Sequence, residues 1–290
     1  MAPRGSSKPR QPDPFRGLTA GVQVSTAPNP GPKTLSGTNV YLVGSRVLID
    51  AGPDDARYID VLAESILRGG GATALLLTHG HPDHAGGAAA LAERLGVPVY
   101  LAPNADPSVL GSLPDVRELG DRDTFDTPSG AVRAVATPGH ARDHFCFWLE
   151  AEGVLFCGDT VLGVGTSLVA RPEGDMAAYL QSLRRIRALH PRLIAPGHGP
   201  PVGDPLAKID EYLEHRRTRE QALMQALEGG PVSLDELVDS VYGPQPSEIR
   251  RLALLSAEAQ LHKLMDEGMV TMHRGAYALS EEAPPAAGDA

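Results

Sequence analysis

The stretch Thr78-His79-Gly80-His81-Pro82-Asp83-His84 places three imidazoles and one carboxylate close together in the chain. It comes directly after a short apolar segment, Ala74 to Leu77, which is typical of a buried strand. So many polar groups would be costly to bury in a core, whereas nitrogen and oxygen donors at this density suit a borderline cation. The stretch therefore predicts a metal site in a loop after a strand, in preference to a solvated His-rich turn.

Three later motifs follow apolar segments in the same way. They are Thr137-Pro138-Gly139-His140, Gly158-Asp159-Thr160 and Pro196-Gly197-His198-Gly199. Each delivers a His or an Asp beside a glycine, so we expect the loops to meet at one sheet edge with close backbone approach. The candidate metal ligands are His79, His81, Asp83, His84, His140, Asp159 and His198. Seven donors exceed the three or four that one catalytic zinc takes, but they fill two sites if Asp159 bridges.

Two metal ions about 3.5–4 Å apart lower the pKa of a shared water toward ~7 and hold both oxygens of a hydrolysis. The sequence therefore predicts a hydrolase that uses a metal-bound hydroxide, with two zinc ions per chain; manganese or iron also suits these ligands. The candidate catalytic residues are Asp83, which is also a ligand, and His144. Two interpretations of His144 stay open, because it suits either proton transfer to substrate or a structural hydrogen bond.

This pattern resembles the metallo-beta-lactamase superfamily, whose signature is His-x-His-x-Asp-His followed by a later His, Asp and His. The resemblance implies a four-layer αββα sandwich. It also implies that His79, His81 and His140 hold one metal, that Asp83, His84 and His198 hold the other, and that Asp159 bridges them. The antibiotic-hydrolysing branches use Cys or Ser in place of Asp159, which argues against a true beta-lactamase. Flavodiiron proteins have Glu in place of His81, which disfavours an oxygen-reducing di-iron site.

Further motifs resemble one group of that superfamily, beta-lactamase-like protein 2. They are Asn29-Pro30-Gly31-Pro32, the turn Gly37-Thr38-Asn39-x-Tyr41 and the helix signature His215-Arg216-x-x-Arg219-Glu220. Members include a single-strand-specific endoribonuclease, and related fungal enzymes are thioesterases that release polyketides from acyl carrier protein. The resemblance therefore implies single-stranded RNA as substrate or, alternatively, a small acyl compound such as an acyl carrier protein, CoA or glutathione thioester.

Composition bears on this choice. The net charge of −10 disfavours general polyanion binding, and an aromatic content of 4% leaves few stacking platforms for single strands. Both features favour the acyl substrate. The basic run His215 to Arg219 either holds phosphate oxygens or forms a solvated helix face. A regulator with a vestigial metal domain is disfavoured, because such a domain has no reason to keep seven donors.

The order of apolar strands and helical patterns predicts an α/β domain followed by a smaller module. We expect a disordered arm over 1–17, the catalytic domain over 18–204, a connecting helix over 205–230, a winged-helix-like domain over 231–282 and a tail over 283–290. The winged-helix-like module holds seven acidic and four basic residues between 231 and 280, so we expect packing or homodimerisation and no DNA binding.

Other features concern location and supporting residues. Nothing approaches the roughly 20 apolar residues of a membrane span, and the N-terminus lacks a secretory h-region, so we expect a cytoplasmic protein without membrane contact. Cys146 and Cys157 lie in predicted strands and are expected to be inert buried thiols. Asp50 ends a predicted strand, where it either orients a ligand imidazole or caps a turn; we favour the first.

Overall fold

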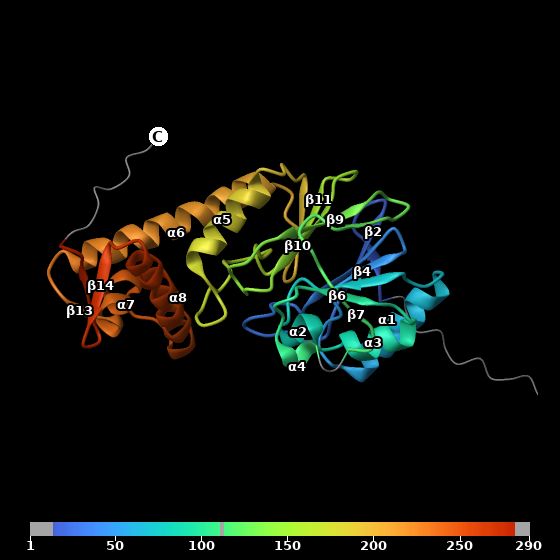
Figure 1. Cartoon of the computed structure of the whole chain (residues 1–290), viewed down its shortest axis with the longest axis horizontal. Coiled ribbons are helices and arrows are strands. Elements are labelled where there is room, and N and C mark those ends of the chain that lie inside the picture. The colour runs from blue at the N-terminus through green and yellow to red at the C-terminus, as the bar shows by residue number, and fades with distance from the viewer. Residues whose placement is uncertain (1–13, 111–112, 282–290) are drawn as a thin grey trace, which may run out of the picture. The chain divides into compact units, whose positions relative to one another are not determined.

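The computed structural model describes residues 14–110 and 113–281, which form two compact units (Figure 1). The described residues of the first unit belong to Met1–Ala134, Phe147–Glu152 and Gly197–Gly199. Those of the second unit belong to Val135–Cys146, Gly153–Pro196 and Pro200–Ala290. Among the described residues, no helix is long and apolar enough to cross a membrane.

A seven-stranded mixed sheet dominates the first unit, and its spatial order follows chain order. The strands are β1 (Arg16–Gly17), β2 (Val22–Thr26), β3 (Asn39–Val43), β4 (Val47–Ile49), β5 (Ala74–Leu76), β6 (Val99–Leu101) and β7 (Val116–Glu118). Neighbours from β1 to β4 pair antiparallel, whereas β4 to β7 pair in parallel. Strands β3 and β4 form a hairpin, in which Tyr41 of β3 lies opposite Ile49 of β4.

Helices of the first unit pack their apolar stripes against this sheet. They are α1 (Ala56–Arg68), α2 (Pro82–Ala85), α3 (Ala88–Leu95) and α4 (Pro107–Leu110). Ile59 and Leu62 of α1 share one core with Leu48 and Leu75 of the strands. Helix α1 begins after Asp55, whose side chain accepts a hydrogen bond from the backbone N–H of Tyr58.

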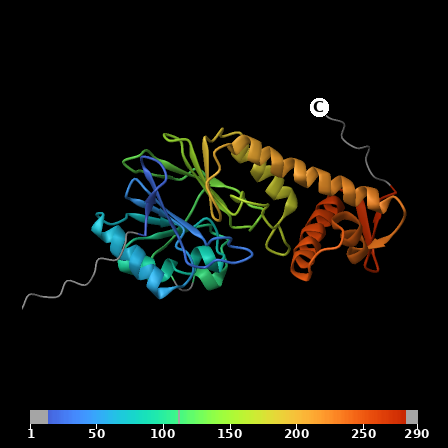
Figure 2. The same cartoon turned by 180° about the vertical axis from the view of Figure 1, so that it is seen from behind.

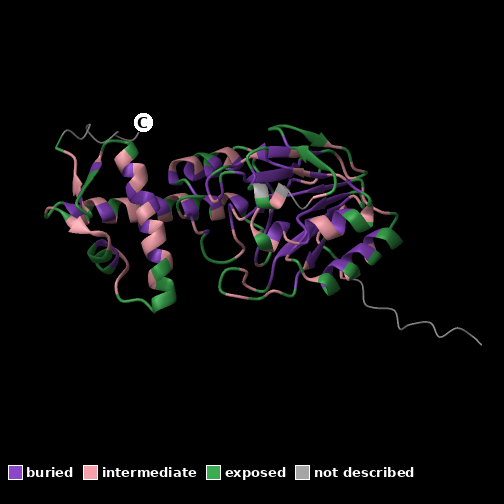
Figure 3. Ribbon diagram, turned by 60° about the horizontal axis from the view of Figure 1, so that its bottom comes forward, coloured by how far each residue is buried: buried purple, intermediate pink, exposed green. Residues whose placement is uncertain are grey.

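The second sheet has five strands in the order β12-β11-β10-β9-β8. They are β8 (Thr124–Phe125), β9 (Val132–Ala136), β10 (Phe145–Leu149), β11 (Val154–Gly158) and β12 (Leu193–Pro196). This sheet is also mixed, since β11 and β12 pair in parallel while β8 and β9 pair antiparallel. Most strand residues of both sheets are buried, as Figure 3 shows. The predicted α/β class is confirmed as two mixed sheets with flanking helices.

Helix α5 and the elements that follow β12 belong to the second unit and are mainly helical. They are α5 (Met176–Arg187), α6 (Pro205–Leu227), β13 (Val232–Ser233), α7 (Leu234–Tyr242), α8 (Ser247–Asp266), β14 (Val270–His273) and β15 (Ala276–Leu279). Helix α6 is the long helix that leads to α7 and α8 in Figure 2. Strands β13, β15 and β14 form a small antiparallel sheet. Arg274 and Gly275 both have positive φ, as a two-residue hairpin turn between β14 and β15 requires.

Two expectations need adjustment. The predicted arm over 1–17 was wrong at its end, because Arg16 and Gly17 pair with β2 as strand β1, while residues 1–13 lie outside the described part. The predicted tail over 283–290 also lies outside it. Helix α6 was predicted as a connecting helix. Its Leu223 and Leu227 are buried in one core with residues of α7 and α8, so the end of α6 is also part of the C-terminal module.

Candidate metal site

The His-rich stretch begins in the loop after β5, as predicted, and its last residues form the short helix α2. His81 is the residue before the helix, and Pro82 occupies its first turn, where a missing backbone N–H costs nothing. Nε2 of His79 lies 2.9 Å from Nδ1 of His81. The rings of His79 and His84 have centroids 4.4 Å apart. The turn therefore directs three imidazoles of the first unit toward one another.

Asp83, His84 and His198 form a compact group of donors in the first unit. Oδ2 of Asp83 lies 3.1 Å from Nε2 of His198 and 3.6 Å from Nε2 of His84. The two Nε2 atoms lie 3.2 Å apart. Both imidazoles are almost fully buried, whereas the Asp83 side chain keeps 28% of its exposure. One nitrogen of each ring and one carboxylate oxygen therefore face the same small space.

The hydrogen-bond partner of Nδ1 in His84 and in His198 determines which ring nitrogen carries the proton. Nδ1 of His84 lies 2.8 Å from Oδ2 of Asp50, and Nδ1 of His198 lies 3.3 Å from the carbonyl oxygen of Gly37. A carboxylate and a carbonyl only accept, so both Nδ1 atoms donate and both Nε2 atoms of the neutral rings carry lone pairs. Two lone pairs and a carboxylate oxygen facing one another repel unless a cation lies among them. This donor set therefore fits a metal ion.

Asp50 supports a second imidazole through Thr78. The Thr78 hydroxyl lies 3.0 Å from Oδ1 and from Oδ2 of Asp50, and its backbone N–H donates to Oδ1 at 2.8 Å. Because this hydroxyl donates its proton to the carboxylate, its oxygen accepts from Nδ1 of His79 at 3.0 Å. Nε2 of His79 is thus left as an acceptor too. The orienting role predicted for Asp50 is confirmed by these contacts.

The turn Gly37-Thr38-Asn39 holds the segment that carries His198. The Asn39 backbone N–H donates to Gly197 O at 2.8 Å, and its side-chain amide donates to Gly199 O at 2.9 Å. The Thr38 hydroxyl reaches Oδ2 of Asp83 at 3.3 Å. The sequence offered this turn only as a motif of a resemblance. The signal that could have revealed its role is that polar Thr38 and Asn39 stand at the start of a buried strand, where their side chains need hydrogen-bond partners.

His140 and Asp159 form a second pair of donors, in the second unit. His140 follows β9 and Asp159 follows β11, as predicted, and Nε2 of His140 lies 3.7 Å from Oδ2 of Asp159. Nδ1 of His140 donates to Leu168 O at 2.8 Å, which leaves Nε2 as an acceptor. Gly139 permits the close approach expected of it. It has φ +144°, and a Cβ there would lie 2.3 Å from Cα of Tyr179.

His144 lies buried behind this pair. Its Nε2 accepts the backbone N–H of Asp159 at 3.2 Å, so its proton is on Nδ1, which lies 2.9 Å from the Thr137 hydroxyl. The side chain is about 1% exposed. Both ring nitrogens are thus engaged within the protein. These contacts favour the hydrogen-bonding interpretation of His144 over proton transfer to a leaving group.

The basic run on α6 does not form one solvated or phosphate-binding face. Arg216 is buried, which fits neither of the two interpretations left open for the run. Arg217 pairs with Glu214 through two bonds of 2.8 Å, and Arg219 donates to Val241 O while it covers the Tyr242 ring. Partial burial, with the charges of Arg216 and Arg219, lowers the pKa of His215. The run mainly makes contacts within the protein.

Both cysteines are fully buried, as predicted. Burial raises the pKa of the Cys146 thiol to about 11, although the Thr137 and Thr160 hydroxyls oppose the shift. Burial also raises the pKa of Cys157 well above its usual value. Neither thiol is therefore a nucleophile or a metal ligand at neutral pH.

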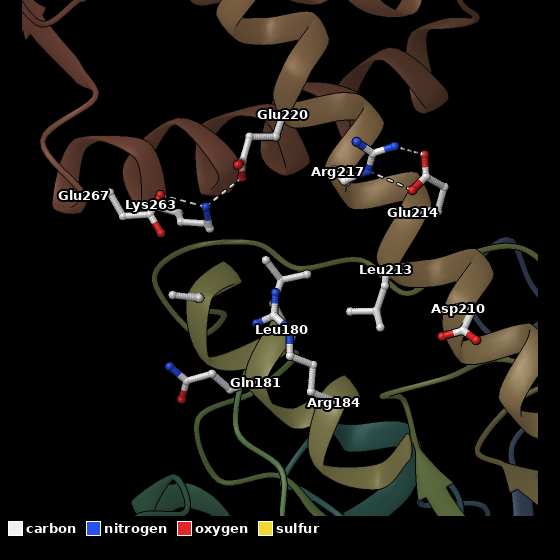
Figure 4. A pocket seen from close by; sticks show the side chains of 11 residues that line it. Leu180, Gln181, Arg184, Asp210, Leu213, Glu214, Arg217, Glu220, Lys263 and Glu267 are labelled. Atoms are coloured by element: carbon white, nitrogen blue, oxygen red, sulfur yellow. Dashed lines mark hydrogen bonds and ion pairs between the residues drawn. The ribbon is translucent and has the colours of Figure 1, made fainter. Parts of the chain in front are cut away.

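A cavity of about 610 Å³ lies between α5, α6 and α8 of the second unit (Figure 4). None of the predicted metal ligands lines it. Its charges largely pair among themselves, since Arg217 contacts Glu214 while Lys263 contacts Glu220 and Glu267 at 2.7 Å each (Figure 4). Ion pairs of this kind leave little charge for a ligand, so this cavity does not compete with the His and Asp clusters as the functional site.

Residues 34–198 match the model of the metallo-beta-lactamase superfamily. The chain belongs to this superfamily. It is a hydrolase of the metallo-beta-lactamase type with a His/Asp metal-binding site, as the resemblance implied.

Relatives of this metallo-beta-lactamase superfamily member cover most of its length. A beta-lactamase-like protein 2 homolog from Drosophila melanogaster is 35% identical over 276 residues, covering 89% of this chain and 92% of the relative. An atrochrysone carboxyl ACP thioesterase from Aspergillus chevalieri is 36% identical over 270 residues, covering 87% and 82%. The crystal structure of a beta-lactamase domain protein from Burkholderia ambifaria covers 95% of this chain and 96% of its own, with TM-score 0.81 and 22% identity. That last likeness concerns the fold alone.

Proposed function

We propose that the chain is a dinuclear metal-dependent hydrolase. The observation that carries this proposal is the convergence of Nε2 of His84 and Nε2 of His198 on Oδ2 of Asp83. In this proposal one metal is held by Asp83, His84 and His198, the other by His79, His81 and His140, and Asp159 bridges them. Zinc suits these ligands, and manganese or iron is compatible with them.

When bound, two such ions lower the pKa of water and polarise the substrate's acyl or phosphoryl oxygen. The chain's own residues supply orientation around them. Asp50 and Gly37 fix the tautomers of His84 and His198, and Leu168 O fixes that of His140. Asp83 is the most exposed of its group, so in this proposal its carboxylate is the protein group that solvent reaches and that holds a proton from the attacking water.

An acyl thioester is the substrate class that we place first. The arginines that would contact RNA phosphates on α6 are buried or held by other groups, as Arg216 and Arg217 illustrate. The net charge of −10 also works against polyanion binding. A relative at 36% identity is named an ACP thioesterase. Thioester hydrolysis adds water to the carbonyl carbon and releases a thiol, which needs no basic surface.

Single-stranded RNA is the second candidate, favoured by the resemblance to the beta-lactamase-like protein 2 group.

The proposal also includes the four-layer αββα arrangement and a winged-helix-like domain over 231–282. The order strand, helix, helix, strand, strand from β13 to β15, preceded by helix α6, supports the winged-helix assignment.

Parallel assays test the function. The protein is stripped with chelator, reloaded with Zn²⁺ or Mn²⁺, and assayed on acyl-CoA, acyl carrier protein thioesters and a single-stranded RNA oligonucleotide. We expect about two metal ions per chain and thioester hydrolysis that disappears on stripping and returns on reloading. RNA cleavage with no thioester hydrolysis would reverse the order of the substrates. Full activity in the stripped protein would overturn the metal-dependent mechanism.

A further inference from the structure

Arg216 is a charged residue on the buried face of α6. It follows Ile209 and Tyr212 along that face and precedes Leu223, all of them buried. Its side chain is about 3% exposed. No carboxylate lies within salt-bridge distance of it among residues 14–110 and 113–281. A buried cation without an acidic partner is costly, so its contacts indicate what it does.

The guanidinium of Arg216 joins three elements of the second unit. One Nη donates to the hydroxyl of Ser256 on α8 at 3.0 Å, and the other donates to the backbone carbonyl of Ser167. The group also lies over the ring of Tyr179 on α5, 5.5 Å from its centroid. A planar, always charged fork can make such divergent bonds at once, whereas a lysine ammonium cannot reproduce their geometry.

Ser167 lies between this arginine and the His140 and Asp159 pair. Its hydroxyl donates to the backbone carbonyl of Asp159 at 2.5 Å and lies 3.3 Å from Nδ1 of His140. The next residue, Leu168, provides the carbonyl that accepts from the same Nδ1 at 2.8 Å. The peptide that Arg216 holds is therefore the one that precedes the carbonyl orienting His140.

Other buried groups hold the same segment from its near end. The Tyr179 hydroxyl donates to Thr160 O at 2.7 Å, and the Tyr212 hydroxyl accepts the backbone N–H of Leu162 at 2.9 Å. Within the described part of the chain, no side chain donates a hydrogen bond to, or accepts one from, the backbone of residues 163–166. Arg216 therefore provides the main support of its far end, where Ser167 and Leu168 meet His140.

We propose that Arg216 is a positioning residue: it holds the 159–168 segment so that Leu168 and Ser167 orient His140 and the backbone of Asp159, and through Ser256 it ties this segment to α8. This inference rests on the proposed function, in which His140 and Asp159 are metal ligands. It assigns the basic run of α6 a role inside the protein instead of a role in contacting phosphate.

The test compares Arg216→Met, which keeps length and removes the charged fork, with Arg216→Lys and with the neighbouring control Arg217→Gln. Two readouts are used: amide hydrogen exchange of peptides from 159–168 in metal-free protein, and Co²⁺ titration followed by visible absorption. For Arg216→Met we expect faster exchange in this segment and about tenfold weaker binding of one Co²⁺, with a changed spectrum. Arg216→Lys should show the same changes, and Arg217→Gln should match the parent protein.

If Arg216→Met does not fold, Arg216→Lys takes its place, because it keeps the charge but cannot reproduce the divergent bonds to Ser167 O and Ser256. Ser167→Ala tests the next contact, that of the Ser167 hydroxyl, and keeps the carbonyl that accepts from Arg216. Ser167→Ala should weaken the binding of one Co²⁺ in the same way, because it removes the hydroxyl that contacts Asp159 O and Nδ1 of His140. Parental exchange and parental Co²⁺ binding in a folded Arg216→Met, or in Arg216→Lys if only that variant folds, would overturn the positioning role. Failure of the parent protein itself to bind Co²⁺ would overturn the proposed function, and the exchange comparison would then decide separately whether Arg216 holds the segment.

Discussion

Oδ2 of Asp50 lies 2.8 Å from Nδ1 of His84, and the same carboxylate accepts the Thr78 hydroxyl that supports His79. One buried carboxylate thus fixes the tautomers of two candidate ligands. Asp50 has φ +62°, a left-handed conformation that Asp and Asn adopt more readily than other residues except glycine. The strand end, the backbone conformation and the ligand orientation therefore depend on one side chain.

Asp50→Asn is expected to weaken metal binding by about 10–100-fold without unfolding the protein. Asparagine tolerates the backbone conformation, but its amide oxygen stays with Thr78 and its NH₂ group faces Nδ1 of His84. That nitrogen must then accept, so the proton moves to Nε2 and blocks ligation. Competition of Zn²⁺ against a chromogenic chelator measures the loss. The exposed neighbour Asp54→Asn is the control, and equal affinities of the two variants would contradict the prediction.

Asp159→Ala is expected to lower turnover by more than His144→Gln does, because Asp159 is the proposed bridging ligand, whereas His144 accepts the backbone N–H of Asp159 and contacts the Thr137 hydroxyl behind it. Metal content should fall in Asp159→Ala and stay near the parental value in His144→Gln. We expect a loss of about 100-fold or more for the first and about tenfold for the second. Metal analysis beside kcat measures both. An Asp159→Ala protein with two tightly held metals would remove the bridging assignment.

Two pairs of residues show which parts of the candidate site could be predicted from the sequence and which could not. His79 and Asp159 could be predicted because polar ligand types stood directly after apolar strands, a local pattern visible in the chain. Arg216 and Ser167 could not, because their contact joins residues 49 positions apart. A basic residue in a polar helix is usually solvated, and only tertiary packing buries this one. Strand β1 was missed for the same reason, since its two residues are ordered by pairing with β2 and not by their own propensity.

The two cysteines are expected to resist alkylation in the native protein. Burial raises the pKa of Cys146 to about 11 and that of Cys157 further above its usual range, so at pH 8 both remain protonated and out of reach. Iodoacetamide followed by mass spectrometry should therefore add no label at pH 8 unless denaturant is present. Two labels should appear once the chain is unfolded. Rapid native labelling of either thiol would contradict the buried positions of β10 and β11.

Leu223→Ala is expected to destabilise the C-terminal module by about 2–5 kcal/mol, as truncation of a buried leucine usually does. Leu223 is fully buried on α6 and shares its core with Leu237 and Leu261. Gln221→Ala, on the exposed side of the same helix, is the control and should change stability by less than about 0.5 kcal/mol. Limited proteolysis with urea unfolding measures the difference. Equal stability of the two variants would return α6 to the role of a simple connecting helix.

Salt dependence separates the two substrate classes. Arg217 and Arg219 are the arginines of the run that are not buried, and replacing both with Gln leaves Arg216 in place. If RNA is the substrate and each contacts one phosphate, raising salt from 50 to 200 mM should weaken single-strand binding by about sevenfold through these two contacts, and the double variant should lose that part of the salt slope. A glutathione thioester, which unlike acyl-CoA carries no phosphate, has nothing of this kind for them to neutralise and is the acyl substrate for this comparison. We expect thioester hydrolysis to change by less than about twofold over the same range, in the parent and the double variant alike.

Measurements of kcat/KM at subsaturating substrate give both slopes, with metal content checked in each sample. RNA cleavage with a steep salt slope that flattens in the double variant would move the substrate assignment to RNA, because only released counterions produce that pattern.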